Sequence, residues 1–231
     1  MITGQQKPLA EIKEMTQPFH KVLIAGCGTC VTVCFAGGEK EVGILAAELR
    51  MARQLEGQPL EIVERTVQRQ CEWEYVDPLQ PEIEGVEAVV SLACGIGVQA
   101  LAQRFPNARV LPGVNTSFLG LPEKPGLFTE RCAACGNCIL HLTGGICPIA
   151  RCSKSLLNGP CGGSAEGHCE IDKEVDCAWQ LIYDRLKALG QLDLMAEIIP
   201  AKDWSTNRDG GPRKIVREDL MLDIPEEGRF G

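Results

Sequence analysis

The chain has 231 residues, 45% hydrophobic and 23% charged, which fits a globular protein of one large or two modest domains. Its formal net charge of −8 disfavours a nucleic-acid partner, because binding a phosphate backbone needs a basic face. No apolar run reaches the ~18–20 residues that span a bilayer, and the N-terminus lacks a signal-peptide pattern, so we expect a cytoplasmic protein without a membrane span.

The first half of the chain alternates between strand and helix patterns. After a polar N-terminal arm at residues 1–19, a short apolar run at 20–26 ends in glycine and predicts a buried strand. Residues 39–55 have helical periodicity. Further strands are predicted at 60–67, 86–93 and 108–111, and a further helix at 96–105. This alternation predicts an α/β fold in which residues 20–118 form a small Rossmann- or flavodoxin-like domain with a parallel sheet.

The second half has a different character. Two prolines and two glycines in residues 119–130 predict a linker. Residues 131–200 are expected to form a cysteine-rich, cluster-binding domain, in which metal supplies much of the folding free energy because apolar periodicity is weak. Its last part, 172–190, is predicted to be a helix with Asp172 as the candidate N-cap. Residues 201–231 form a charged tail that we expect to bind a partner.

Thirteen cysteines dominate the chemistry of the sequence. A secreted disulfide scaffold would be shorter, would carry a signal sequence and would have an even number of cysteines. In a reducing compartment, thiolates at close spacing are more often ligands of metals or clusters. We therefore expect metal ligation.

The first group of cysteines follows the first predicted strand. Cys27, Cys30 and Cys34 lie within eight residues in a glycine-rich loop, and Cys94 ends a later strand. Because ligands bind outside the carboxyl ends of parallel strands, these thiols are expected at one edge of the sheet. Cys71 follows the second predicted strand and is placed at the same edge. The group predicts a metal site, holding either a third [4Fe–4S] cluster or a zinc ion.

Two other interpretations of this loop stay open. A dinucleotide-binding loop would need the pattern GxGxxG, but Gly26 and Gly28 supply only a fragment and Val31 occupies the third glycine position. A mononuclear zinc site built from Cys27, Cys30 and two other ligands is the second, because the CxxC spacing serves zinc and clusters alike.

The second group is denser. Cys132, Cys135 and Cys138 are separated by two residues each, the spacing with which bacterial ferredoxins hold a [4Fe–4S] cluster, and Cys147 precedes a proline as in such runs. A zinc-ribbon module would instead present separated CxxC pairs. Eight cysteines match two clusters, and we expect one on Cys132, Cys135, Cys138 and Cys177 and the other on Cys147, Cys152, Cys161 and Cys169.

Motifs of nucleophilic or acid–base catalysis are missing from the sequence. It contains no GxSxG, no HExxH and no P-loop. We therefore predict no catalytic residue. The favoured function is electron transfer, and the alternatives are a zinc-stabilised scaffold subunit and an iron–sulfur oxidoreductase acting on its own small substrate.

Several segments together resemble one known family, the iron–sulfur small subunit (MetV type) of the two-subunit methylenetetrahydrofolate reductases of anaerobic bacteria. The resemblance extends over nearly the whole chain. It is carried by the segments at residues 26–42, 69–71, 91–99, 132–138, 158–163, 177–183 and 202–205.

The resemblance implies a hetero-oligomer with a TIM-barrel flavoprotein that reduces methylenetetrahydrofolate in the one-carbon branch of acetyl-CoA synthesis. This chain would then be a non-catalytic subunit of an oxidoreductase, carrying electrons from a donor protein to the partner's flavin. The resemblance also implies that zinc is associated with such subunits besides [4Fe–4S] clusters. The nature of the N-terminal cysteine site therefore stays open.

Overall fold

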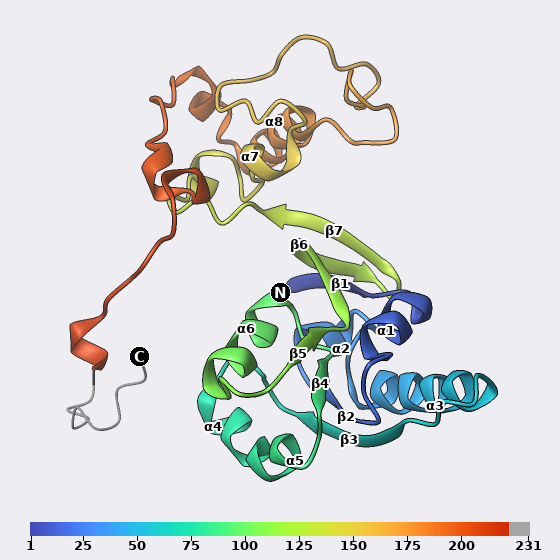
Figure 1. The fold of residues 1–231 in the computed structure, drawn as a ribbon. Helices are drawn as coiled ribbons and strands as arrows, with labels where there is room; N and C mark the ends of the chain where they lie inside the picture. The colour runs from blue at the N-terminus through green and yellow to red at the C-terminus, as the bar shows by residue number, and fades with distance from the viewer. Residues whose placement is uncertain (222–231) are drawn as a thin grey trace. The chain divides into compact units, whose positions relative to one another are not determined.

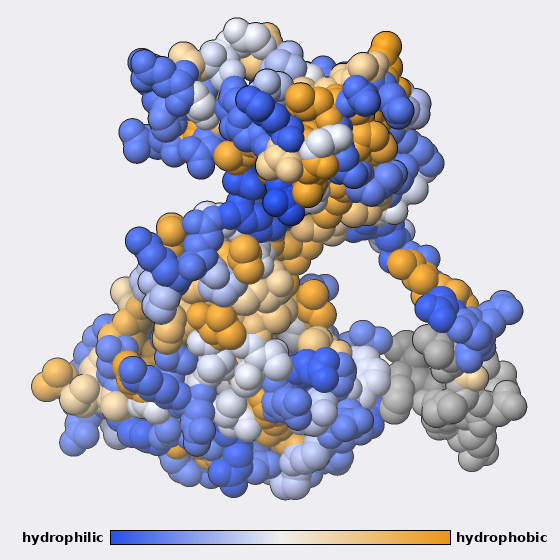
Figure 2. Space-filling view, turned by 180° about the vertical axis from the view of Figure 1, so that it is seen from behind, coloured by the Kyte–Doolittle hydropathy of each residue, from blue (hydrophilic) through white to orange (hydrophobic). Residues whose placement is uncertain are grey.

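A computed structural model of the protein describes residues 1–221, which divide into two compact units at Ala133 and Ala134 (Figure 1). The predicted tail at 201–231 extends past this limit, so its last ten residues lie outside the described part. Within residues 1–221, no helix has both the length and the apolar content needed to cross a bilayer. Hydrophilic side chains cover much of the visible surface of each unit, with apolar ones interspersed (Figure 2).

A parallel four-stranded sheet forms the centre of the first unit, with the strand order β3-β2-β4-β5. The chain moves outward from β2 to β3 and then returns to the other side of β2, so the strand order reverses between β2 and β4. The four strands are β2 (Lys21–Cys27), β3 (Glu61–Val67), β4 (Ala88–Ser91) and β5 (Val110–Pro112). These strands lie within the segments that sequence periodicity predicts, or overlap them closely, and the parallel α/β sheet is confirmed.

Helices cover both faces of this sheet. On one face lie α1 (Leu9–Thr16) and α3 (Glu39–Leu55), and on the other lie α4 (Trp73–Val76), α5 (Gln80–Glu84) and α6 (Gly95–Arg104). A short helix, α2 (Cys30–Val33), follows β2, and a 3-10 turn at Asp77–Leu79 precedes α5. Each face therefore has its own apolar layer.

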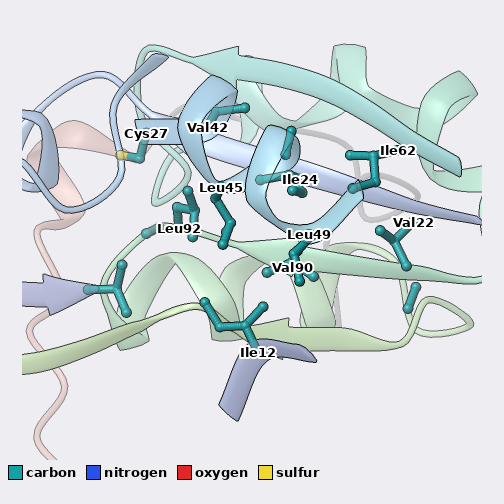
Figure 3. Close-up of a cluster of buried hydrophobic side chains, with 14 of the residues drawn as sticks. Ile12, Val22, Ile24, Cys27, Val42, Leu45, Leu49, Ile62, Val90 and Leu92 are labelled. Carbon is teal, nitrogen blue, oxygen red and sulfur yellow. The ribbon is translucent and has the colours of Figure 1, made fainter. Parts of the chain in front are cut away.

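The larger apolar layer lies between α3 and the sheet. Val42, Leu45 and Leu49 of α3 pack against Ile24 and Val90 of the strands, and Cys27 lies in the same buried cluster (Figure 3). Burying a side chain of this size stabilises the fold by about 1.5–3 kcal/mol. Cys27 is thereby held on a rigid strand.

The start of α3 is fixed locally. The backbone N–H of Gly38 donates to the Glu41 carboxylate at 2.9 Å, which ties the N-cap to the third helical residue. The predicted helix and the observed one have the same bounds, Glu39–Leu55.

A second sheet occupies segments for which the sequence predicts an arm and a linker. It is antiparallel, with the order β1-β6-β7, and its strands are β1 (Ile2–Gln6), β6 (Val114–Lys124) and β7 (Leu127–Cys132). The turn-forming residues near 125–126 thus connect two strands of a hairpin. The predicted linker at 119–130 is corrected to this hairpin, and the arm at 1–19 to β1 and α1.

Up to residue 221, the second unit contains the helices α7 (Pro148–Arg151) and α8 (Ala178–Leu189). Its remaining regular elements are 3-10 turns at Leu140–Leu142, Leu192–Ala196, Trp204–Thr206, Arg208–Gly210 and Glu218–Leu220. The buried apolar core is small, made by Cys177, Trp179, Ile182 and Leu186.

The helix predicted from Asp172 begins six residues later, at Ala178 with Cys177 as its N-cap. Residues before it are engaged with the cysteine loop instead: the N–H of Cys169 donates to the Val175 carbonyl at 2.8 Å, and that of Cys177 to the Gly167 carbonyl at 2.7 Å. Residues 172–176 form a turn and a β-bridge between Asp176 and His168 in place of a helix. The helix ends at Gly190, whose φ of 68° is the left-handed conformation that glycine favours.

Candidate metal centres

Three cysteines of the first unit follow three neighbouring parallel strands. Cys27 is the last residue of β2, Cys71 lies four residues beyond the end of β3, and Cys94 is the N-cap of α6 just after β4. The carboxyl ends of parallel strands meet at one edge of a sheet, and ligands of α/β sheets bind where the strand order reverses. The three cysteines therefore come from the edge that suits a bound group.

The pKa of the Cys71 thiol depends on the other two cysteines at this edge. Partial burial of its thiol, in a residue that is otherwise exposed, raises the pKa of Cys71, and negative charge on Cys27 and Cys94 raises that pKa further. Like charges disfavour one another's ionisation only when they lie close together. Both Cys27 and Cys94 thus act on the ionisation of the Cys71 thiol.

Cys30 and Cys34 form a separate pair on α2. Burial raises the pKa of the Cys34 thiol, and negative charge on Cys30 raises it further. The Cys34 sulfur lies 3.7 Å from the carbonyl oxygen of Ile2 in β1. Cys34 thus lies near the backbone of β1 and is affected by Cys30.

Four cysteines of the second unit line one small enclosed cavity: Cys152, Cys161, Cys169 and Cys177. They come from the end of α7, from the long loop between α7 and α8, and from the N-cap of α8. Trp179 lines the same cavity and donates from its indole Nε1 to the Leu156 carbonyl at 3.1 Å, which fixes the apolar wall. The loop is therefore folded around the four sulfurs.

Two of these sulfurs have hydrogen-bonding neighbours. The backbone N–H of Gly163 donates to the Cys161 sulfur at 3.5 Å, and the Cys169 sulfur is hydrogen-bonded to the Ser153 hydroxyl at 3.3 Å. The Ser153 hydroxyl, followed by the backbone N–H of Ile171, lowers the pKa of Cys169. A thiolate is therefore favoured at a position that faces the cavity.

The rim of the cavity carries an ion pair between Lys154 and Glu170. A side chain at position 163 would collide with this carboxylate, because its Cβ would lie 1.4 Å from Oε2 of Glu170. Gly163 thus lets the backbone approach both Cys161 and Glu170. This close approach explains the use of glycine in the Cys161-Gly-Gly163 segment.

The other four cysteines lie elsewhere. Cys132 ends β7 in the first unit, whereas Cys135 and Cys138 lie in the loop that opens the second unit, and Cys147 is the N-cap of α7. The sequence-based grouping joined Cys177 to the run that begins at Cys132. The structure instead brings Cys177 to the cavity of Cys152, Cys161 and Cys169.

The loop of Cys135 is held by residues that sequence reasoning assigned to a tail. The Thr206 hydroxyl donates to the Cys135 carbonyl at 2.9 Å, and the Arg213 guanidinium donates to the carbonyls of Ala134 and Thr206 at 2.6 and 3.0 Å. Gly136 has a φ of 81°, and a Cβ there would lie 2.4 Å from the Thr206 carbonyl oxygen. No local pattern in the sequence predicts this contact across about seventy residues.

The donor set at the cavity of Cys152, Cys161, Cys169 and Cys177, four cysteine sulfurs, is one that both a [4Fe–4S] cluster and a zinc ion take. Within residues 1–221, no three or more Cys, His, Asp or Glu side chains form a group that could hold a metal ion.

A comparison with protein families gives one match. Residues 111–205 match the model of a family described as methylene-tetrahydrofolate reductase C terminal. The match supports a protein related to methylenetetrahydrofolate reductase. It spans less than half of the 231 residues but includes all eight cysteines of the second group and none of the first. No curated protein and no solved structure matches the chain.

Proposed function

We propose that this chain is an iron–sulfur electron-transfer subunit of a methylenetetrahydrofolate reductase complex in one-carbon metabolism. The observation that carries the proposal is the cavity lined by Cys152, Cys161, Cys169 and Cys177. It lies inside the segment that matches the methylene-tetrahydrofolate reductase family. Four cysteines are the ligand set of a [4Fe–4S] cluster.

A bound cluster supplies the ability to accept and release single electrons. The chain's own residues bind it and set its environment. The N–H of Gly163 donates to the Cys161 sulfur, and the Ser153 hydroxyl, which is hydrogen-bonded to the Cys169 sulfur, would donate to it once Cys169 is a thiolate ligand. Such donors raise the reduction potential of a cluster by stabilising its more negative state. Trp179 and the core around α8 exclude water from one side of the cavity.

The remaining second-group cysteines of the second unit, Cys135, Cys138 and Cys147, are proposed to bind a second cluster. Two centres would let an electron enter from a donor protein and leave toward a partner. We propose a flavoprotein as that partner, with folate chemistry confined to it. This chain then acts as a non-catalytic subunit of an oxidoreductase.

Metal analysis of anaerobically purified protein tests the proposal. We expect a brown protein with about four irons per cluster and a matching amount of acid-labile sulfide, and an electron paramagnetic resonance signal on reduction. The Cys169→Ser variant should lose the iron of one cluster. Glu174→Ala, a change at an exposed position of the same loop, should keep it.

A colourless protein that contains zinc alone would contradict electron transfer and would favour a scaffold subunit. A second test uses the complete complex. Cys135→Ser should abolish reduction by the natural electron donor, while a small reducing dye still reduces the flavin of the partner. Full activity of that variant with its natural donor would refute the relay, and turnover by this chain without a flavoprotein would favour an independent enzyme.

A further inference from the structure

A cavity of about 530 Å³ opens in the first unit beside the antiparallel sheet. Its walls come from β1, β6, the start of β7 and the turn at residues 34–36 that follows α2. Three aromatic rings line it, those of Phe35, Phe118 and Phe128. The volume lies within the roughly 300–1,000 Å³ of pockets that bind small molecules.

The lining of this cavity carries no charge. Within residues 1–221, no Asp, Glu, Lys, Arg or His side chain lines it, although 23% of the chain is charged. The cavities beside Arg109 and beside Glu64, by contrast, have both acidic and basic lining residues. The polar side chains next to the three rings include Gln5, Gln6 and Ser117. This lining disfavours a phosphate or carboxylate ligand, because a buried charge needs a partner of opposite charge.

One buried polar group on the wall of the cavity is unsatisfied. Thr3 is 4% exposed, and its hydroxyl oxygen makes no hydrogen bond to any residue in the described part of the chain. Thr3 lies directly opposite Phe118 in the pairing of β1 with β6, and opposite residues of paired strands point to the same face of a sheet. Both residues line the cavity. A buried hydroxyl without a partner costs free energy, and a ligand that hydrogen-bonds to it would remove this cost.

Phe35 presents an aromatic ring from an unusual backbone conformation. Its φ of 54° lies in the left-handed region, which is costly for a bulky side chain, and the residue is 60% exposed. The N–H of Phe35 donates to the Thr32 carbonyl at 3.0 Å, and that of Ala36 donates to the Val31 carbonyl at 2.9 Å. These bonds fix the turn that places the ring at the cavity. An exposed ring on a fixed turn suits stacking on a planar ligand.

We propose that this cavity binds an uncharged, planar nitrogen heterocycle, with Phe35 stacked on its face and the Thr3 hydroxyl hydrogen-bonded to its edge. Ring nitrogens and ring carbonyls supply the hydrogen-bonding groups that a hydroxyl needs, and an aliphatic ligand would leave Thr3 unsatisfied. The Thr3 oxygen is closed to solvent, so a lining side chain must shift when the ligand enters. Phe35 is the most exposed of the three rings. The proposal goes beyond electron transfer, because the second-group cysteines do not line this cavity.

The test is a calorimetric titration of the full-length, anaerobically purified protein with riboflavin and with adenosine. These probes present a three-ring and a two-ring heterocycle without a charged group, and we expect at least one of them to bind. The phosphate form of that probe should bind no more tightly, because the lining offers no cation. Phe35→Ala should weaken binding about tenfold, as expected for the loss of one stacking contact. Tyr183→Ala, at an exposed aromatic residue of the second unit, should leave binding unchanged.

Thr3→Val distinguishes a binding role of the hydroxyl from a structural one. The change replaces an unsatisfied hydroxyl by a methyl group of similar size, so the free protein should melt at the same or a higher temperature. Binding of the heterocycle should weaken about five- to tenfold. A lower melting temperature, unchanged affinity of Thr3→Val, tighter binding of the phosphate form or no binding of either probe would each overturn the proposal. Iron and sulfide contents should equal those of the wild type, so the outcome is independent of the clusters proposed for the second unit.

Discussion

The side-chain oxygen of Gln70 accepts a hydrogen bond of 2.6 Å from the hydroxyl of Ser91, deep in the first unit. Neither residue is exposed, and the Ser91 oxygen in turn accepts from the backbone N–H of Ala93 at 3.3 Å. The bond joins a residue after one strand to the end of another. Buried polar pairs of this kind are costly to break, because each partner loses its hydrogen bonds without regaining water.

We predict that Gln70→Met lowers the free energy of unfolding of the first unit by about 1–3 kcal/mol. The change keeps the side chain's length but leaves Ser91 without its acceptor and the Gly26 carbonyl without this donor. Urea unfolding followed by circular dichroism measures the loss. The control is Gln99→Met at an exposed position of α6, which should change stability by less than about 0.5 kcal/mol. Equal effects of the two variants would contradict the structural role of Gln70.

Arg53 provides a second buried polar anchor. Arg53 is 2% exposed, and its guanidinium donates to the carbonyls of Thr16, Phe19 and Gln58 at 2.9–3.2 Å. Arg53→Met should therefore lower the free energy of unfolding by about 3 kcal/mol, because three carbonyls lose a charged donor.

The control for Arg53 is Arg65→Met. Arg65 forms an ion pair with Glu82 and its side chain is 58% exposed, so its loss should cost less than about 1 kcal/mol. Thermal unfolding of the two variants at one pH gives the comparison. A larger loss of stability in Arg65→Met than in Arg53→Met would show that the hydrogen bonds of Arg53 to the three carbonyls contribute little to the stability of the fold.

Two glycines should respond to alanine in opposite directions. A Cβ at Gly37 would lie 1.8 Å from the Leu92 carbonyl oxygen, so Gly37→Ala must displace backbone and should be strongly destabilising. Gly43 lies inside α3, where a Cβ would meet only a Glu64 oxygen at 3.8 Å. Gly43→Ala should therefore raise stability by about 0.5–1 kcal/mol. Melting temperatures that move in the same direction would contradict this packing.

Acid should weaken one connection between strands. Glu87 accepts hydrogen bonds from the backbone N–H groups of His20 and Lys21 at 2.6 and 2.9 Å, and these bonds lower its pKa from the usual 4.5. A carboxyl group whose pKa is lower in the folded than in the unfolded protein stabilises the fold fully at pH values above its unfolded-state pKa. This contribution is lost as the pH falls through the lowered pKa of the folded state.

The wild-type protein should therefore melt at a higher temperature than Glu87→Gln near pH 6. The difference should shrink as the pH falls below 4.5. Melting curves of both proteins between pH 6 and pH 3 measure it. A difference that grows with acid would mean that the carboxylate is not the stabilising form.

Removal of metal should affect the two units differently. The described part of the second unit has only a small apolar core, so its folding should depend on bound metal. The first unit has two extensive apolar layers. In metal-free protein, hydrogen exchange should show loss of protection in α8 and retained protection in β2 and β4. Retained protection in α8 would show that the second unit folds without metal.

Much of the parallel sheet follows from the sequence alone. Alternating apolar runs and helical periodicity are local signals, and they place β2, α3 and the strands that follow to within a few residues. The cysteines that end β2 and precede α6 could be placed at the sheet edge by the same reasoning, since parallel strands bring their carboxyl ends together.

The antiparallel sheet and the sorting of the cysteines depend on tertiary structure. Residues 1–6 lack a strong strand pattern and pair with β6, whose residues are more than 100 positions away. Spacing along the chain likewise did not indicate that Cys177 shares a cavity with Cys152, or that Gln70 ties the strand ends. Such contacts depend on where distant segments meet when the whole chain packs, because a hydrogen bond or a shared cavity has no periodicity along the sequence.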